Sequence, residues 1–257
     1  MQILYAIILG LVQGLTEFLP VSSSGHLLLL EKLGVGEPDV FFNVMLHAGT
    51  LVAVLIALFK DWSPLVRHPL QKTTGMLFVA CLPTLAIALL FKFLFPSLLD
   101  GKILGFGFVL TATLLFVGEN FQIAQNRVLS YKNTVLSGVL QGIAVLPGVS
   151  RSGATISCLT FLGVDKKSAA RFSFLLSIPA ILASCAVEIF ELVKGGITLA
   201  SPWYCVLIGT LVAFASGLVA IKFFLKLIEN HRLSLFIIYT SILGVVVSIL
   251  PIFSINL

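Results

Sequence analysis

Hydrophobic residues along this chain form six long, nearly uninterrupted segments and two segments that polar residues interrupt. An α-helix of roughly 20 apolar residues is long enough to cross the hydrocarbon of a bilayer. The pattern therefore predicts six membrane-spanning helices. They cover about 42–60, 74–95, 103–119, 167–190, 204–226 and 233–252.

The two interrupted segments cover residues 3–33 and 131–163. Apolar stretches of about 10–14 residues are typical of re-entrant elements rather than crossings. In the first segment the apolar stretch gives way to polar residues and breaks at Pro20. We therefore predict a helix over about 3–19, a broken turn, and a helix over about 23–33 that returns to the same face. The second segment repeats this pattern.

The chain contains an internal repeat. Gly10–His26 aligns without a gap on Gly138–Ala154, 128 positions later, and the apolar segments follow the same shift. This predicts one membrane domain, 1–257, built from pseudo-repeats of about 1–125 and 129–257. Three crossings separate the two hairpins, so the second repeat is expected to be inverted. The two hairpin turns would then enter from opposite faces and meet near the midplane.

The differences between the two copies are chemical. Glu17 aligns with Val145, Ser23 with Arg151, and His26 with Ala154. One copy supplies a carboxylate and an imidazole, and the other supplies a guanidinium. A charged side chain at this depth is costly, which marks it as a candidate functional residue.

Composition places the chain among all-α polytopic membrane proteins. Hydrophobic residues make up 58% of it, charged residues 11%, and the mean hydropathy is +1.11. The net charge of +5 does not indicate a nucleic-acid partner, because the basic residues occupy short loops and form no basic arm. The four cysteines are scattered through apolar segments, which is typical of small buried side chains.

The basic loop residues predict an orientation. The face that holds both termini would carry four of them: Lys32, Lys92, Lys102 and Lys194. The opposite face would carry eleven: Lys60, Arg67, Lys72, Arg127, Lys132, Lys166, Lys167, Arg171, Lys222, Lys226 and Arg232. Because cytoplasmic loops are enriched in Lys and Arg, we expect both termini outside the cytoplasm.

The two turns carry groups suited to a phosphate. Gln13 and Glu17 share a helix face, because they are four positions apart. Arg151 offers a planar fork that matches phosphate oxygens. Helix N-termini at both turns would favour an anion between them. Hydroxyl groups at the two turns add donors, and they belong to Ser22, Ser23, Ser24, Ser150, Ser152 and Thr155.

Each of these residues also has a purely structural interpretation. Glu17 and Arg151 could form only a buried ion pair that ties the turns together. The serines could serve only as helix caps, and His26 could be an interior histidine without a catalytic role. Asn43 and His47 share one face of the first span, where they are placed to line the same cavity.

The two motifs resemble those of the undecaprenyl-diphosphate phosphatase family, the bacitracin-resistance membrane proteins of bacteria. The segment QGLTEFLPVSSSGH matches its first signature region, from Gln13 to His26. The segment LPGVSRSGAT matches its second region, P-G-x-S-R-S-x-x-T, which includes Gly148. The likeness extends over the whole chain. At Gln13 this sequence has an amide, so Glu17 is the only acid of the first motif.

The resemblance implies a hydrolase in the bacterial plasma membrane. It would convert undecaprenyl diphosphate to undecaprenyl phosphate and phosphate, which recycles the lipid carrier of cell-wall synthesis and confers bacitracin resistance. The implied catalytic residues are Glu17, Ser23, His26 and Arg151. Mg²⁺ or Ca²⁺ bridging Glu17 and the diphosphate is also implied, and no organic cofactor is expected. Membrane lipids are the remaining partners, and a homodimer is compatible with the pattern.

A polyprenyl-phosphate transporter or flippase is the alternative, because inverted repeats with broken helices and a midplane site are common among transporters. Glu17, Ser23 and His26 distinguish the two functions. An anion-binding site needs a cation and helix ends, but it does not need an acid or a nucleophile beside them. The sequence leaves three nucleophiles open: Ser23, His26 and a water activated by Glu17.

Overall fold

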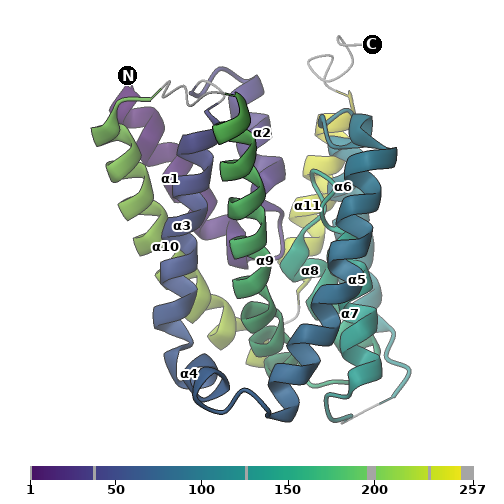
Figure 1. The fold of residues 1–257 in the computed structure, drawn as a ribbon. Helices are drawn as coiled ribbons and strands as arrows, with labels where there is room; N and C mark the ends of the chain where they lie inside the picture. Colours follow the sequence, from purple (N-terminus) through teal and green to yellow (C-terminus); the bar gives the residue numbers. More distant parts are fainter. Residues whose placement is uncertain (1, 37–38, 125–126, 196–200, 231–232, 250–257) are drawn as a thin grey trace.

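The structure, a computed structural model, describes residues 2–36, 39–124, 127–195, 201–230 and 233–249 (Figure 1). Within these ranges the chain forms eleven α-helices, one 3-10 helix and no β-strand. In chain order they are α1 (Gln2–Phe18), α2 (Ser23–Lys32), α3 (Val40–Ala57), α4 (Phe59–Arg67), α5 (Lys72–Leu94), η1 (Pro96–Leu98), α6 (Leu104–Asn120), α7 (Tyr131–Ile143), α8 (Arg151–Phe161), α9 (Lys166–Gly195), α10 (Trp203–Asn230) and α11 (Ser234–Ile249).

Four of the described helices, α3, α5, α9 and α10, are long and apolar enough to cross a membrane. Helices α1, α6 and α11 are apolar but shorter. Of the six predicted spans, the one over 103–119 corresponds to α6, which has 17 residues. The one over 233–252 corresponds to α11, and its last three positions lie outside the described residues. Long apolar helices without strands are the build of a polytopic membrane protein.

The two interrupted segments each form a pair of helices, as the sequence predicts. Helices α1 and α2 agree with the predicted boundaries to within one residue, and α7 and α8 occupy the second segment. The second helix of each pair begins at a serine N-cap. The Ser22 hydroxyl accepts from the Gly25 N–H at 3.3 Å, and the Ser150 hydroxyl accepts from the Gly153 N–H at 3.1 Å.

Glycines allow the short helices to pack closely on the long ones. Helix α1 packs along α10, and α7 packs along α5. A Cβ atom at Gly10 would lie 2.5 Å from the carbonyl oxygen of Gly209, and one at Gly138 would lie 2.1 Å from that of Ala80. Both distances are too short for a real contact, so the backbones approach only because these positions lack a side chain.

Ion pairs fix the beginning of α9 to three other helices. Lys166 pairs with Glu119 of α6 at 2.8 Å, and Lys167 pairs with Glu229 of α10 at 2.6 Å. Arg171 pairs with Asp61 of α4 at 3.2 Å. The beginning of α9, the end of α10 and α4 lie at the same end of the bundle (Figure 1), so the three pairs join helices there.

The predicted separation of basic residues matches the arrangement of the helices. Helices α4 and α7, the beginnings of α5 and α9 and the end of α10 lie at one end of the bundle (Figure 1). Helix α1 begins, and α5, α9 and α11 end, at the opposite end. The larger basic group therefore lies at one end and the smaller at the other, while Arg232 lies outside the described residues.

We expect alanine at Gly10 or Gly138 to lower the unfolding temperature in detergent by several degrees. The added methyl group overlaps a backbone oxygen, and overpacking of this kind costs about 1–3 kcal/mol. Gly217→Ala is the matched comparison, because its Cβ would meet no backbone oxygen, and its nearest neighbour would be the Ala53 Cβ at 3.2 Å. We expect this variant to lose less stability than Gly10→Ala or Gly138→Ala. Wild-type stability in Gly138→Ala would mean that α5 and α7 do not approach this closely.

Candidate active site

The turn between α1 and α2 and the turn between α7 and α8 touch each other. The Ser152 hydroxyl donates to the Leu19 carbonyl oxygen at 3.1 Å. A Cβ at Gly25 would lie 2.9 Å from the Cα of Gly148, and one at Gly153 would lie 3.4 Å from the Cβ of Pro20. Two segments that are far apart in the sequence therefore form one site.

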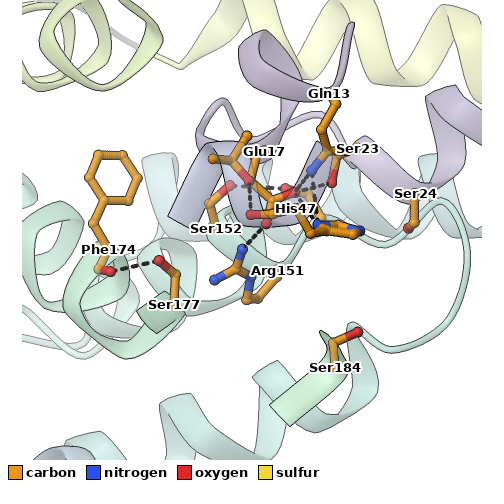
Figure 2. A network of polar contacts seen from close by, with 12 residues as sticks. Gln13, Glu17, Ser23, Ser24, His47, Arg151, Ser152, Phe174, Ser177 and Ser184 are labelled. Carbon is orange, nitrogen blue, oxygen red and sulfur yellow. Dashed lines mark hydrogen bonds and ion pairs between the residues drawn. The ribbon is translucent and has the colours of Figure 1, made fainter. Parts of the chain in front are cut away.

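Glu17 is at the centre of this site, and only 4% of its side chain is exposed. Its Oε1 accepts a hydrogen bond from Nη2 of Arg151, with which it forms an ion pair. Its Oε2 accepts from the Ser23 hydroxyl at 2.5 Å and from Nε2 of Gln13 at 3.0 Å. Figure 2 shows these side chains converging on the carboxylate. The two copies of the motif thus supply the two partners of one ion pair.

His47, from α3, is the imidazole that joins this cluster. Its Nδ1 lies 2.9 Å from Nε2 of Gln13 and 3.8 Å from Oε2 of Glu17 (Figure 2). Because an amide nitrogen only donates, Nδ1 is the acceptor, and the proton of neutral His47 is on Nε2. The sequence placed His47 and Asn43 on one face. The structure brings His47 into the cluster, whereas Asn43 donates to Glu31 at 3.2 Å instead.

Two buried polar atoms of the cluster have no hydrogen-bond partner among the described residues. They are Nη1 of Arg151 and Oε1 of Gln13. A buried polar atom without a partner is costly, so it points to a group that completes the site. Nη1 suits an anionic oxygen, and Oε1 suits a cation or a donor. Arg151 and His47, each with 18% of its side chain exposed, and the half-buried Ser23 are the cluster members that remain accessible.

The other predicted site residues surround this cluster. Ser22 and Ser150 are N-caps, one of the two roles that the sequence left open for the serines. The Ser24 hydroxyl lies 3.5 Å from that of Ser22, and the Ser152 hydroxyl lies 3.2 Å from that of Ser150. The two turns therefore place their hydroxyl groups in equivalent positions.

Gly148 and Thr155 lie on either side of Arg151 and stabilise the turn between α7 and α8. Gly148 has a φ of 86°, a region that favours glycine, and its carbonyl oxygen accepts from the Thr111 hydroxyl at 2.8 Å. Thr155 is fully buried and bonds to the Ser173 hydroxyl at 2.6 Å. Its hydroxyl also donates to carbonyl oxygens of its own helix. These contacts fix the position of Arg151 at the beginning of α8.

His26 has other partners than Glu17. Its Nδ1 lies 2.7 Å from the Ser22 carbonyl oxygen, and its Nε2 lies 2.6 Å from the Tyr239 hydroxyl of α11. Phe108 packs edge-on against the ring, with centroids 5.3 Å apart. The sequence did not single out Tyr239, because it is one aromatic residue among many in an apolar span.

Glu17 and Gln13 are the residues of this cluster that could hold a divalent cation. Among the described residues, no group of three or more His, Cys, Asp or Glu side chains could hold a metal ion. Mg²⁺, however, is often bound by one or two carboxylates together with substrate phosphates. Glu17 would supply the carboxylate here, and the unpartnered Oε1 of Gln13 would be a second hard oxygen ligand.

Known proteins resemble this chain over nearly its whole length. The family model described as bacitracin resistance protein BacA matches residues 6–246. Undecaprenyl-diphosphatase of Halothermothrix orenii is 38% identical over 256 residues, which cover 97% of this chain and 98% of that protein. Undecaprenyl-diphosphatase of Christiangramia forsetii is 40% identical over 258 residues, which cover 95% and 96%. The chain therefore belongs to the bacitracin resistance protein BacA family.

Proposed function

We propose that this protein is an integral membrane undecaprenyl-diphosphatase, which hydrolyses undecaprenyl diphosphate to undecaprenyl phosphate and phosphate. Family membership supports the reaction and the lipid substrate. One observation in the structure carries the chemistry: the Ser23 hydroxyl donates to the Glu17 carboxylate beside Arg151. A nucleophile (Ser23), a base (Glu17) and a cation (Arg151) thus lie together in one partly buried site. The reaction recycles the lipid carrier of cell-wall synthesis and gives resistance to bacitracin.

Arg151 binds the diphosphate. Its Nη2 is engaged by Glu17, and its Nη1 remains for a phosphate oxygen. The N-termini of α2 and α8 direct partial positive charge to the same place. His47 contributes its Nε2–H as a further donor. Enzymes of phosphoryl transfer mainly position groups and neutralise charge, and this set does both.

Ser23 is the nucleophile of the first step. Its Oγ transfers its proton to Glu17 and attacks the terminal phosphorus, and the bond from phosphorus to the bridging oxygen breaks. Undecaprenyl phosphate leaves with that electron pair. A water then gives a proton to Nε2 of His26, which lies three positions along α2 from Ser23 and on the same face, and the water oxygen attacks the phosphorus of the phosphoserine. The bond between phosphorus and Oγ of Ser23 breaks, Oγ takes its proton back from Glu17, and phosphate leaves. His26 then releases the proton of the water to solvent, which restores the neutral ring.

Glu17 and Oε1 of Gln13 would hold the divalent cation that the family resemblance implies. A bound Mg²⁺ or Ca²⁺ would supply additional positive charge to the phosphate oxygens. The protein groups of the site keep their roles beside it, because Arg151 and Ser23 reach the substrate through their own atoms.

Hydrolysis accounts for the site better than transport of a polyprenyl phosphate. A transport site needs Arg151 and the helix ends for binding. It has no use for a serine hydroxyl held at 2.5 Å from a carboxylate, which is the arrangement of an activated nucleophile.

The architecture that we propose is an inverted repeat with two re-entrant hairpins, α1–α2 and α7–α8. Pseudo-repeats over about 1–125 and 129–257 are supported by equivalent contacts: α1 packs on α10 as α7 packs on α5. Gly10 meets Gly209, and its counterpart Gly138 meets Ala80, one position from the counterpart of Gly209. Both hairpins meet at Glu17 and Arg151. One chain supplies this whole site, so a homodimer would pair two complete sites.

We expect the purified protein in detergent to release phosphate from a long-chain prenyl diphosphate. Detergent removes the membrane, so transport cannot produce this signal. Phosphate is measured with and without Mg²⁺ or Ca²⁺. Binding of the lipid without release of phosphate under all these conditions would favour the transporter.

We expect Ser23→Ala to abolish turnover and Arg151→Lys to lower kcat by about 10²–10³. Lysine keeps the charge of Arg151 but loses the fork, and loss of one stabilising donor has this effect at comparable sites. Thr113→Ala is the control for loss of a hydroxyl, because Thr113 is exposed and donates only to its own helix. Thermal unfolding is measured beside turnover. If both variants lose stability but keep turnover per folded molecule, Glu17 and Arg151 form only a structural ion pair.

We expect both termini outside the cytoplasm, because the end of the bundle where α1 begins carries fewer basic residues. A reporter that is active only in the cytoplasm should give no signal when fused after Leu257. The same reporter inserted after the fully exposed Leu70, between α4 and α5, should be active. The opposite pattern would reverse the orientation.

A further inference from the structure

We propose that Tyr239 is a positioning residue that holds the unprotonated Nε2 of His26 in place by donating its hydroxyl to it. The geometry of the His26–Tyr239 contact carries this inference, and its catalytic consequence rests on the proposed phosphatase function. Tyr239 comes from α11, the last described helix, whereas His26 comes from α2, near the beginning of the chain. The second half of the chain therefore supplies a hydrogen-bond partner for a residue of the first motif.

The hydrogen bonds of His26 define its tautomer. A carbonyl oxygen only accepts, so Nδ1, at 2.7 Å from the Ser22 oxygen, carries the proton. Nε2 of the neutral ring then holds a free electron pair, and the Tyr239 hydroxyl donates to it at 2.6 Å. Free imidazole exchanges between two tautomers, whereas the Ser22 carbonyl oxygen selects one of them and the Tyr239 hydroxyl orients its Nε2.

The backbone conformation of Ser22 directs its carbonyl oxygen to His26. Ser22 has a φ of 71° and is the one described residue other than glycine with a positive φ. This conformation is costly for an L-residue and is found where the surroundings enforce it. The same residue caps α2 with its hydroxyl and directs its carbonyl oxygen to His26. The strained turn thus holds the first ring nitrogen.

Ring packing fixes the direction in which Nε2 of His26 points. The rings of Tyr239 and His26 are stacked, with an angle of 11° between their planes and centroids 5.7 Å apart. Phe108 holds the imidazole from another side. A phenol hydroxyl both donates and accepts, so Tyr239 remains a partner when His26 takes up a proton. Tyr239 is 46% exposed, so its hydroxyl can move aside when the attacking water binds Nε2 of His26.

The test compares Tyr239→Phe with Tyr204→Phe. Phenylalanine keeps the stacked ring at position 239 and removes only the hydroxyl. Tyr204 lies on α10, packs edge-on against Trp203 and is 40% exposed, so it is a matched control. Tyr239→Phe should lower kcat by about three- to tenfold, the loss expected for one neutral hydrogen bond, with KM unchanged. In a His26→Ala background the same change should have no further effect.

A direct measurement of the tautomer separates this proposal from the proposed function. Nitrogen-15 NMR of histidine-labelled protein, with the His26 signals assigned by their loss in His26→Ala, should show a protonated Nδ1 and an unprotonated Nε2. Tyr239→Phe should shift the Nε2 resonance, because it removes the hydrogen bond that this nitrogen accepts, and Tyr204→Phe should not. An unchanged Nε2 resonance and unchanged kcat in Tyr239→Phe would overturn the assignment of Tyr239. Failure of the wild type to release phosphate would instead overturn the phosphatase function and leave the tautomer result standing.

Discussion

The ion pair between Glu17 and Arg151 is the interaction on which the rest of this structure depends. The two residues are 134 positions apart. Glu17 lies near the end of α1, and Arg151 is the first residue of α8. A single charge in a membrane interior is costly, and a buried pair is tolerated only with good geometry and additional hydrogen bonds. Ser23 and Gln13 supply those bonds to Glu17. The same groups that make the ion pair tolerable are those that a phosphoryl-transfer site needs.

Broken helices within a membrane protein impose a second constraint, since their free backbone groups need partners. Thr111 of α6 is the partner of two such backbone groups in the turn between α7 and α8. Its hydroxyl donates to the Gly148 carbonyl oxygen and accepts from the Ser150 N–H, both at 2.8 Å. The capping serines Ser22 and Ser150 satisfy the beginnings of α2 and α8. The turns are therefore rigid, which fixes the positions of Arg151 and Ser23.

The two imidazoles near the turns have different surroundings. His47 is bound by Gln13 through Nδ1, so Nε2 of the neutral ring carries the proton. His26 is bound by Ser22 through Nδ1, so its Nε2 is free of a proton and accepts. The proposed mechanism uses this difference: one ring binds the phosphate, and the other takes a proton from water. Neither role follows from the residue type alone, because the hydrogen bond at Nδ1 decides it.

The sequence by itself determined the features that depend on local order. Apolar runs, the break at Pro20 and the serine caps located the helix pairs α1–α2 and α7–α8, and the two motifs identified the family. Packing decided the rest. The entry of His47 into the cluster and the contact of His26 with Tyr239 join helices far apart along the chain, and no local pattern encodes which side chains then meet. Helix periodicity describes one segment at a time, whereas a site between helices depends on how all of them pack.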